Sequence, residues 1–112
     1  MRISHDKKRD LGARIRQQRD ARDISLRDLA KACDMNYATL YDIECGNGFP
    51  RRKVVRCLVE RLFSKPEDKI AIYDLYAKIK ESAPPDVIDY LYENHNTVAM
   101  VRRLMQEGKG NG

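Results

Sequence analysis

Two short helical segments joined by a tight turn constrain the fold of this chain more than any other feature of its sequence. Ser25 and Asn36 are residue types whose side chains accept hydrogen bonds from the exposed amides of a first helical turn. They predict helices over residues 26–33 and 37–45. Gly46 ends the second helix, because glycine adopts the left-handed conformation without a steric penalty. Apolar residues recur at helical spacing in both segments, so both are expected to face a core.

The rest of the chain shows the same helical periodicity, and no stretch alternates with period two for long. Ser64 and Glu67 form a capping box with a proline inside the first turn, which is a strong start signal for a helix. We therefore predict an all-α fold. The other expected helices cover residues 6–22, 51–63, 65–81, 86–93 and 97–107.

Length and composition narrow the class of protein. At 112 residues, of which 42% are hydrophobic, the chain suits one compact domain with a small core. No apolar run approaches the roughly 18 residues of a membrane-spanning helix, and the charged N-terminus is unlike a signal peptide. These features argue against a membrane protein, a secreted disulfide scaffold or a large enzyme. We expect a cytoplasmic protein.

The cysteines and histidines suggest neither a metal site nor catalysis. Cys33, Cys45 and Cys57 contain no C-x-x-C pair, and their odd number favours reduced thiols that pack as small hydrophobic residues. His5 and His95 lie in expected terminal or loop segments and have no clustered partners. We expect no metal, no cofactor and no enzymatic activity.

The positive charge is confined to the first part of the chain. Residues 1–63 hold 15 Lys and Arg against 9 Asp and Glu, a net charge of +6, whereas residues 64–112 hold 7 against 8, a net charge of −1. Three cations, Arg51, Arg52 and Lys53, begin an expected helix, where they oppose the helix dipole. Because this placement is locally unfavourable for stability, it indicates binding of a polyanion such as the phosphate backbone of a nucleic acid.

The two capped helices, the turn between them and the residues around them resemble the XRE-type helix-turn-helix family, which includes phage repressors and Cro-like proteins. The resemblance covers residues 11–62. The matching landmarks are Leu11-Gly12, Ile15-Arg16, Leu29-Ala30, Ile43-Glu44-Cys45-Gly46 and Pro50. It implies a five-helix-type DNA-binding bundle with additional C-terminal helices, in a regulator of bacterial or phage origin that binds operator DNA as a homodimer.

We accordingly expect three parts. Residues 1–63 would form the helix-turn-helix domain, residues 64–107 a helical extension for dimerisation, and residues 108–112 a flexible tail. The apolar stripes of the extension exceed what one small domain needs. The alternative is that the extension merely enlarges the core of the monomer.

The resemblance also implies which residues contact double-stranded DNA. Those expected to face the groove are Asn36, Tyr37, Ala38, Thr39, Tyr41 and Asp42, and those expected at the backbone are Ser25, Arg27, Asn47, Arg51, Arg52 and Lys53. The tyrosines have an alternative role, partial burial against Phe49 or the C-terminal helices. Glu44 matches a position that is mainly structural in the family.

The sequence departs from the family pattern at several contact positions. The helix over residues 37–45 carries no Lys or Arg, and Leu26 stands where the family often has a DNA-contacting glutamine. Asp42 would either accept a hydrogen bond from cytosine or repel phosphate. Two functions remain open: a sequence-specific transcriptional regulator, most simply a repressor, and a protein-interaction module such as the antitoxin of a toxin–antitoxin pair.

Overall fold

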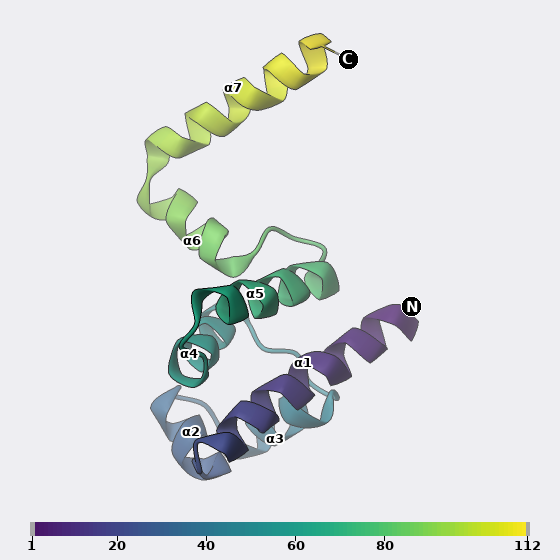
Figure 1. The fold of residues 1–112 in the computed structure, drawn as a ribbon, viewed down its shortest axis with the longest axis vertical. Coiled ribbons are helices and arrows are strands. Elements are labelled where there is room, and N and C mark those ends of the chain that lie inside the picture. Colours follow the sequence, from purple (N-terminus) through teal and green to yellow (C-terminus); the bar gives the residue numbers. More distant parts are fainter. Residues whose placement is uncertain (1, 112) are drawn as a thin grey trace.

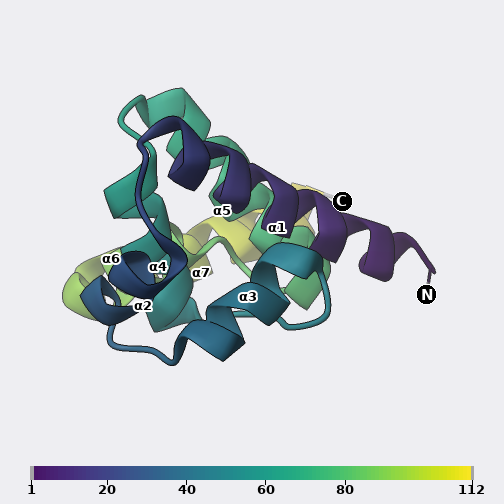
Figure 2. The same ribbon diagram turned by 90° about the horizontal axis from the view of Figure 1, so that it is seen from below.

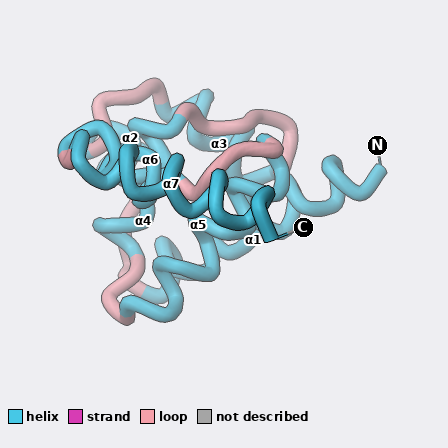
Figure 3. The backbone as a smooth tube through the Cα atoms, turned by 90° about the horizontal axis from the view of Figure 1, so that it is seen from above, coloured by secondary structure: helices cyan, strands magenta, loops and turns pink. Residues whose placement is uncertain are grey.

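The computed structural model describes the backbone of residues 2–111 and the side chains of residues 6–108, and all the regular secondary structure in this range is helical. The helices are α1 (Arg2–Ala21), α2 (Leu26–Ala32), α3 (Tyr37–Cys45), α4 (Arg52–Leu62), α5 (Pro66–Lys80), α6 (Pro85–Glu93) and α7 (His95–Asn111). Only short loops connect them (Figure 3). The predicted all-α class, with helices added after a helix-turn-helix bundle, is confirmed.

Helices α1 to α5 share one core. Its members are buried side chains from all five helices: Leu11, Ile15, Leu29, Ala30, Cys33, Leu40, Ile43, Val55, Leu58, Val59, Leu62, Phe63, Ile72, Tyr73 and Tyr76. Helix α1 packs on α3, α4 and α5, and its N-terminal turns project beyond the other helices (Figures 1 and 2). The core therefore extends past residue 63 and takes in α5.

The local signals read from the sequence set the ends of α2 and α3 as expected. The Ser25 hydroxyl accepts a hydrogen bond from the Asp28 amide at 3.0 Å, and the Asn36 side chain accepts one from the Ala38 amide at 2.8 Å. Gly46 closes α3 with a φ of 83°. Both predicted N-caps and the predicted glycine stop are confirmed.

The predicted capping box at the start of α5 is wrong. Lys65 is the N-cap residue of α5, and it makes no side-chain capping bond in the described structure. The hydroxyl of Ser64 instead accepts a hydrogen bond from the Arg22 guanidinium at 3.3 Å. A contact between residues far apart in sequence has therefore replaced the local cap.

The outer helices differ from the expected ranges at their ends. Helix α1 begins at Arg2, four residues earlier than predicted, and α7 begins at His95. The side chain of Asn94 donates to the Tyr90 carbonyl at 2.9 Å, so Asn94 marks the break before α7. Helix α7 runs on to Asn111 and includes most of the segment expected to be a tail, although side chains beyond residue 108 lie outside the described part.

Helices α6 and α7 leave the five-helix unit. Helix α6 packs on α4 and α5, while α7 packs on α6 and projects away, which gives the molecule extents of 51 × 32 × 23 Å (Figure 1). Four large apolar side chains of α7 are exposed: Met100, Val101, Leu104 and Met105. In the described part of the chain, no helix is long and apolar enough to cross a membrane.

Candidate nucleic-acid interface

The turn between α2 and α3 is closed by backbone hydrogen bonds. Asp34 has a φ of 52°, a left-handed conformation that aspartate tolerates better than most residues other than glycine. The next amide, that of Met35, donates to the Ala30 carbonyl at 2.9 Å. The turn therefore leaves α3 in a fixed orientation relative to α2, with little freedom in the connection.

Close backbone contact with α1 holds α3 from behind. A Cβ atom at Gly12 would lie 2.2 Å from the Ile43 carbonyl oxygen and 2.7 Å from that of Glu44. Only glycine permits this approach, because any larger residue would push α1 away from the end of α3. This contact explains why a Leu-Gly pair stands in the first helix.

An ion pair supplies the second attachment between α1 and α3. The Arg19 guanidinium donates to both oxygens of the Glu44 carboxylate, at 2.7 and 3.0 Å, and also to the Ile24 carbonyl at 2.9 Å. The hydrogen bond to Glu44 raises the pKa of Arg19 above its ordinary value. The Glu44 side chain is 4% exposed, so its carboxylate positions α3 and does not face a ligand.

The opposite face of α3 is open to solvent. Tyr37 and Tyr41 are 44% and 56% exposed. The other predicted groove-facing residues are exposed as well: Asn36, Ala38, Thr39 and Asp42. The structure therefore brings all six together on the side of α3 that the core leaves uncovered.

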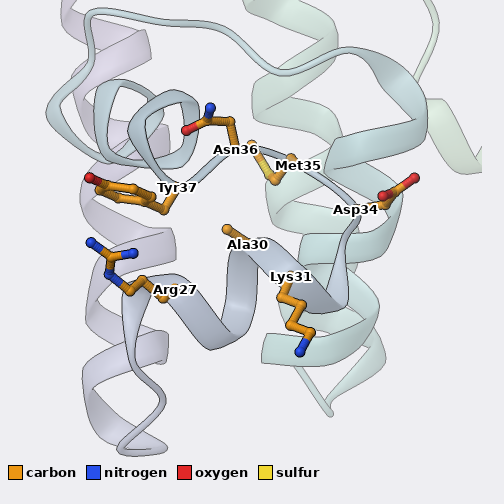
Figure 4. Close-up of a pocket in the computed structure, with 7 residues that line it drawn as sticks. All are labelled: Arg27, Ala30, Lys31, Asp34, Met35, Asn36 and Tyr37. Carbon is orange, nitrogen blue, oxygen red and sulfur yellow. The ribbon is translucent and has the colours of Figure 1, made fainter.

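A hollow of about 410 Å³ lies between α2 and the start of α3, lined by Arg27, Ala30, Lys31, Asp34, Met35, Asn36 and Tyr37 (Figure 4). The Arg27 guanidinium lies over the Tyr37 ring, 4.1 Å from its centroid. Phe49 instead stacks on Tyr76, with the ring centroids 4.7 Å apart. Tyr37 thus packs on Arg27, while Phe49 packs on Tyr76.

The three consecutive cations at the start of α4 do not point the same way. Arg51 and Lys53 are exposed and line a second hollow, of about 450 Å³, together with Asp34 of the α2–α3 turn. Arg52 instead pairs with Asp89 of α6 at 3.2 Å and lies 5.3 Å from the centroid of the Tyr92 ring. Arg51 and Lys53 are therefore placed beside the helix-turn-helix, while Arg52 is engaged with α6.

Several cations of α1, and Arg22 just after it, are engaged within the protein. Arg19 is bound to Glu44, and Arg22 donates to the Leu62 carbonyl at 2.6 Å. Arg14 pairs with Asp10 on the helix surface at 2.9 Å. The net charge of the first 63 residues thus overstates the number of cations available to a polyanion.

Two features near α3 were missed in the sequence. Cys45 is exposed, and it lies seven residues after Ala38, two helical turns along the uncovered side of α3. A hydrogen bond with Cys45 raises the pKa of Tyr41 above its ordinary value. Lys31 adds a second cation to the lining of the hollow (Figure 4). Helical spacing from Ala38 would have identified Cys45.

The prediction that all three cysteines are reduced and unpaired is wrong for two of them. Cys33, the C-cap of α2, is joined to Cys57 of α4 in a disulfide, with the Cα atoms 5.8 Å apart. The pairing could not be read from the sequence, because the two cysteines are separated by 24 positions and only the packing of the bundle brings α2 next to α4 (Figure 2). Among the described residues, no cluster of three or more His, Cys, Asp and Glu side chains has a metal-site arrangement.

Comparison with known proteins adds one finding. A family model described as a helix-turn-helix domain matches residues 10–67, slightly more than half of the chain. Neither curated proteins nor solved structures gave a match. The matched range begins in α1 and ends at the start of α5, so it contains the turn, α3 and both attachments of α3 to α1.

Proposed function

The chain belongs to the helix-turn-helix domain family, and on this premise we propose that it is a sequence-specific transcriptional regulator of the XRE type that represses by binding operator DNA. Helix α3 enters the major groove in this proposal. The observation that carries it is the contrast between the two sides of α3. One side is fixed to α1 through Gly12 and the Arg19–Glu44 pair, and the other exposes six side chains to solvent.

The exposed side of α3 carries side chains suited to contacts with base edges, and it lacks the cations that would bind phosphates. Tyr37 and Tyr41 carry donors, and Ala38 together with the Thr39 methyl offers apolar contact to thymine. Asp42 accepts a hydrogen bond from a cytosine amino group. Because α3 itself lacks cations, affinity must come from the flanks of the helix.

We assign the phosphate contacts to both flanks. Ser25 and Arg27 lie at the start of α2, and Arg51 and Lys53 lie at the start of α4, with Asn47 in the preceding loop. These contacts fix the position of the protein on the duplex and leave discrimination to α3. Arg52 can contact phosphate only if its ion pair with Asp89 is broken.

A homodimer completes the proposal, because one recognition helix covers few base pairs. We place the DNA-binding unit in α1–α5, whose helices share the core, and assign dimerisation to α6 and α7. Two recognition helices would then address half-sites about 34 Å apart, one turn of DNA. Changing Leu104 to Glu should convert the dimer to a monomer in sedimentation equilibrium, because a charge would enter the buried interface.

The main test is selection of bound sequences from a randomised DNA duplex library, followed by footprinting on the selected sequence. We expect an enriched motif with two-fold symmetry. Tyr37→Ala should change the motif, whereas Ile70→Ala, which removes an exposed large side chain of α5 outside both proposed interfaces, should not. If the protein retains no duplex at low salt, the proposed regulator function is refuted.

A salt titration tests the phosphate contacts separately. Lys53→Ala should weaken binding to selected and random duplexes alike, and it should reduce the slope of log affinity against log salt by about one unit. Lys78→Ala, which removes an exposed lysine of α5, serves as the matched control and should leave the slope unchanged. An unchanged slope in Lys53→Ala would remove Lys53 from the interface.

The exposed apolar side chains of α7 support a second function, a protein-interaction module such as an antitoxin that grips its partner through α7. The two functions differ in what covers this helix. If the purified chain stays monomeric at high concentration and retains no duplex, while a protein encoded by an adjacent gene binds it and this binding is lost in Leu104→Glu, the second function is favoured.

A further inference from the structure

The Cys33–Cys57 disulfide occupies a position that neither the family nor the proposed contacts to DNA explain. Helix α2 packs mainly on α3, whereas α4 packs on α1, α5 and α6. The disulfide therefore joins two helices whose main packing partners differ. The covalent ring that it closes runs from residue 33 to residue 57.

This ring contains most of the candidate interface. All of α3 lies within it, together with Asn47, Arg51 and Lys53. When the disulfide is formed, the groove-facing helix and the basic start of α4 are held in one closed loop. When it is broken, the turn at Asp34 can move relative to α4, because the covalent link between α2 and α4 is gone.

The disulfide lies in the second hollow, which has a volume of about 450 Å³ and is lined by Ala32, Cys33, Asp34, Arg51, Lys53, Val54 and Cys57. Cys33 is buried, while Cys57 is partly exposed and is the sulfur that a small molecule reaches first. Two cations face one carboxylate in this hollow. Positive charge stabilises a thiolate and attracts an anionic thiol or disulfide.

The structure also offers a hydrogen-bond acceptor to the reduced form of Cys57. The Cys57 sulfur lies 3.8 Å from the Ala32 carbonyl oxygen, to which a thiol at this position can donate. The Cys57 thiol of the reduced state therefore has a hydrogen-bond acceptor within reach.

We propose that Cys33 and Cys57 are a reversible redox pair, that their hollow admits an anionic small-molecule thiol or disulfide such as glutathione, and that the oxidised pair favours DNA binding. The last part rests on the proposed regulator function. Oxidation strengthens binding because the closed ring fixes α3 and the start of α4 before DNA arrives, which lowers the ordering cost of binding.

The exchange proceeds in two balanced steps. The Cys57 thiolate attacks the disulfide RSSR, forms a mixed disulfide with one RS group and releases the other as RS⁻. The Cys33 thiolate then attacks the Cys57 sulfur, closes the protein disulfide and releases the second RS⁻. Two cysteine thiols are thereby oxidised by two electrons, RSSR is reduced to two thiols, and the two cysteine protons pass to the released thiolates. Reduction is the reverse.

The first test measures the pair itself. The purified full chain is equilibrated in buffers of graded reduced-to-oxidised glutathione ratio, its free thiols are alkylated, and the Cys33 and Cys57 peptides are measured by mass spectrometry. We expect both peptides to titrate together, and Cys45→Ser, which removes the exposed third cysteine, to titrate like the wild type. Two free thiols at every ratio, or a disulfide that excess glutathione never reduces, would overturn the proposal.

The second test compares the oxidised and reduced forms of the wild-type protein. Reducing the wild-type pair should lower the thermal unfolding midpoint by about 10 °C, because the unfolded chain loses its crosslink. Cys57→Ser should unfold at the midpoint of the reduced wild type and should no longer respond to glutathione. A midpoint independent of the redox state would show that the ring does not constrain the fold.

The third test asks whether the redox state of the pair changes the affinity for DNA. Affinity for the selected duplex should be at least about fivefold higher in the oxidised form than in the reduced form, the lower end of common coupling between sites. A pair that titrates without any change in affinity would overturn the regulatory part. If neither form binds any duplex, the proposed function fails, while the alkylation and unfolding tests still decide the redox pair.

Discussion

The five-helix unit of α1–α5 and the extension of α6 and α7 are built on opposite principles. In the unit, apolar side chains from five helices meet in one core in which Ile15, Leu40 and Leu58 are completely buried. In the extension, Pro85 is the buried residue among those described, and Leu104 is 64% exposed. Apolar residues recur at helical spacing in the extension, but no other described helix covers the face of α7 on which they lie.

This difference assigns different sources of stability to the two regions. Burial of apolar surface is the main favourable term in folding, so the unit can fold on its own contacts. The extension depends on the junction with α4 and α5 and on whatever surface covers α7. The junction is polar in part: Asp89 of α6 pairs with Arg52 at 3.2 Å and with Arg56 at 3.0 Å.

The largest effect we predict sets a core leucine against an exposed one. Leu58→Ala should lower the free energy of unfolding by about 2–5 kcal/mol, because it opens a cavity in the core. Leu104→Ala should change it by less than about 0.5 kcal/mol in dilute, monomeric protein. Urea denaturation measures both. Equal decreases in the free energy of unfolding would contradict this difference between the two regions, because they would mean that Leu104 is packed within the monomer.

A second prediction concerns the attachment of α3 inside the unit. Glu44→Gln should lower the free energy of unfolding by about 2–3 kcal/mol, because the Arg19 guanidinium loses a charged partner at a site that is 13% exposed. The loss stays below that of a fully buried pair because Arg19 keeps the Ile24 carbonyl. Asp10→Asn breaks the exposed pair with Arg14 and is the matched control, expected to cost less than about 0.5 kcal/mol. Chemical denaturation compares the two.

A third prediction sharpens the boundary between the two regions. Asp89→Asn removes the partner of Arg52 and Arg56, so α6 should loosen from α4. The cost in global stability should be below about 1 kcal/mol, because these side chains are partly exposed. Hydrogen exchange should speed up at the amides of α6 and not at those of α4. Equal acceleration in both helices would mean that the unit and the extension open together.

The same variant tests Arg52 as a DNA contact. Released from Asp89, Arg52 is free to reach phosphate, and the salt slope of DNA binding should steepen in Asp89→Asn. If the slope stays at the wild-type value, Arg52 belongs to the junction. Asp74→Asn, which changes an exposed carboxylate of α5, is the control for lost negative charge.

The unit was more predictable from its sequence than the extension for a physical reason. Caps such as Ser25 and Asn36 act through bonds within one helical turn, so residue type and spacing reveal them. The role of Glu44 followed only from the family resemblance. Contacts between distant residues stayed hidden: Arg22 on Ser64, Arg52 on Asp89, and Cys33 on Cys57.

The candidate interface divides in the same way. Helical spacing places residues on the exposed side of α3, and all the expected ones are there. Spacing does not tell which neighbouring cations are free, because that depends on acceptors from other helices. Three adjacent cations therefore looked equivalent in the sequence, and the fold separates Arg52 from Arg51 and Lys53.

The smallest effect we predict is a pH dependence within the unit. The Glu60 carboxylate of α4 accepts from Lys69 at 2.7 Å and from the Tyr73 hydroxyl at 3.0 Å, both on α5. The hydrogen bond from Lys69 lowers the pKa of Glu60 below its ordinary value of 4.5. A lowered carboxyl pKa stabilises the fold above the ordinary value, and this contribution is lost as the pH falls through the lowered one.

Glu60→Gln should therefore reduce the free energy of unfolding at pH 7 by less than about 1 kcal/mol, since the side chain is 46% exposed. The difference from the wild type should shrink as the pH falls below 4.5 and disappear once Glu60 is protonated in the folded protein. Glu107→Gln, at an exposed position of α7, is the matched control and should show no such trend, because the extension contributes little to the unit. Denaturation at pH 7 and pH 3 measures both variants. A difference between Glu60→Gln and the wild type that is the same at pH 7 and pH 3 would mean that Glu60 acts through packing and not through its charge.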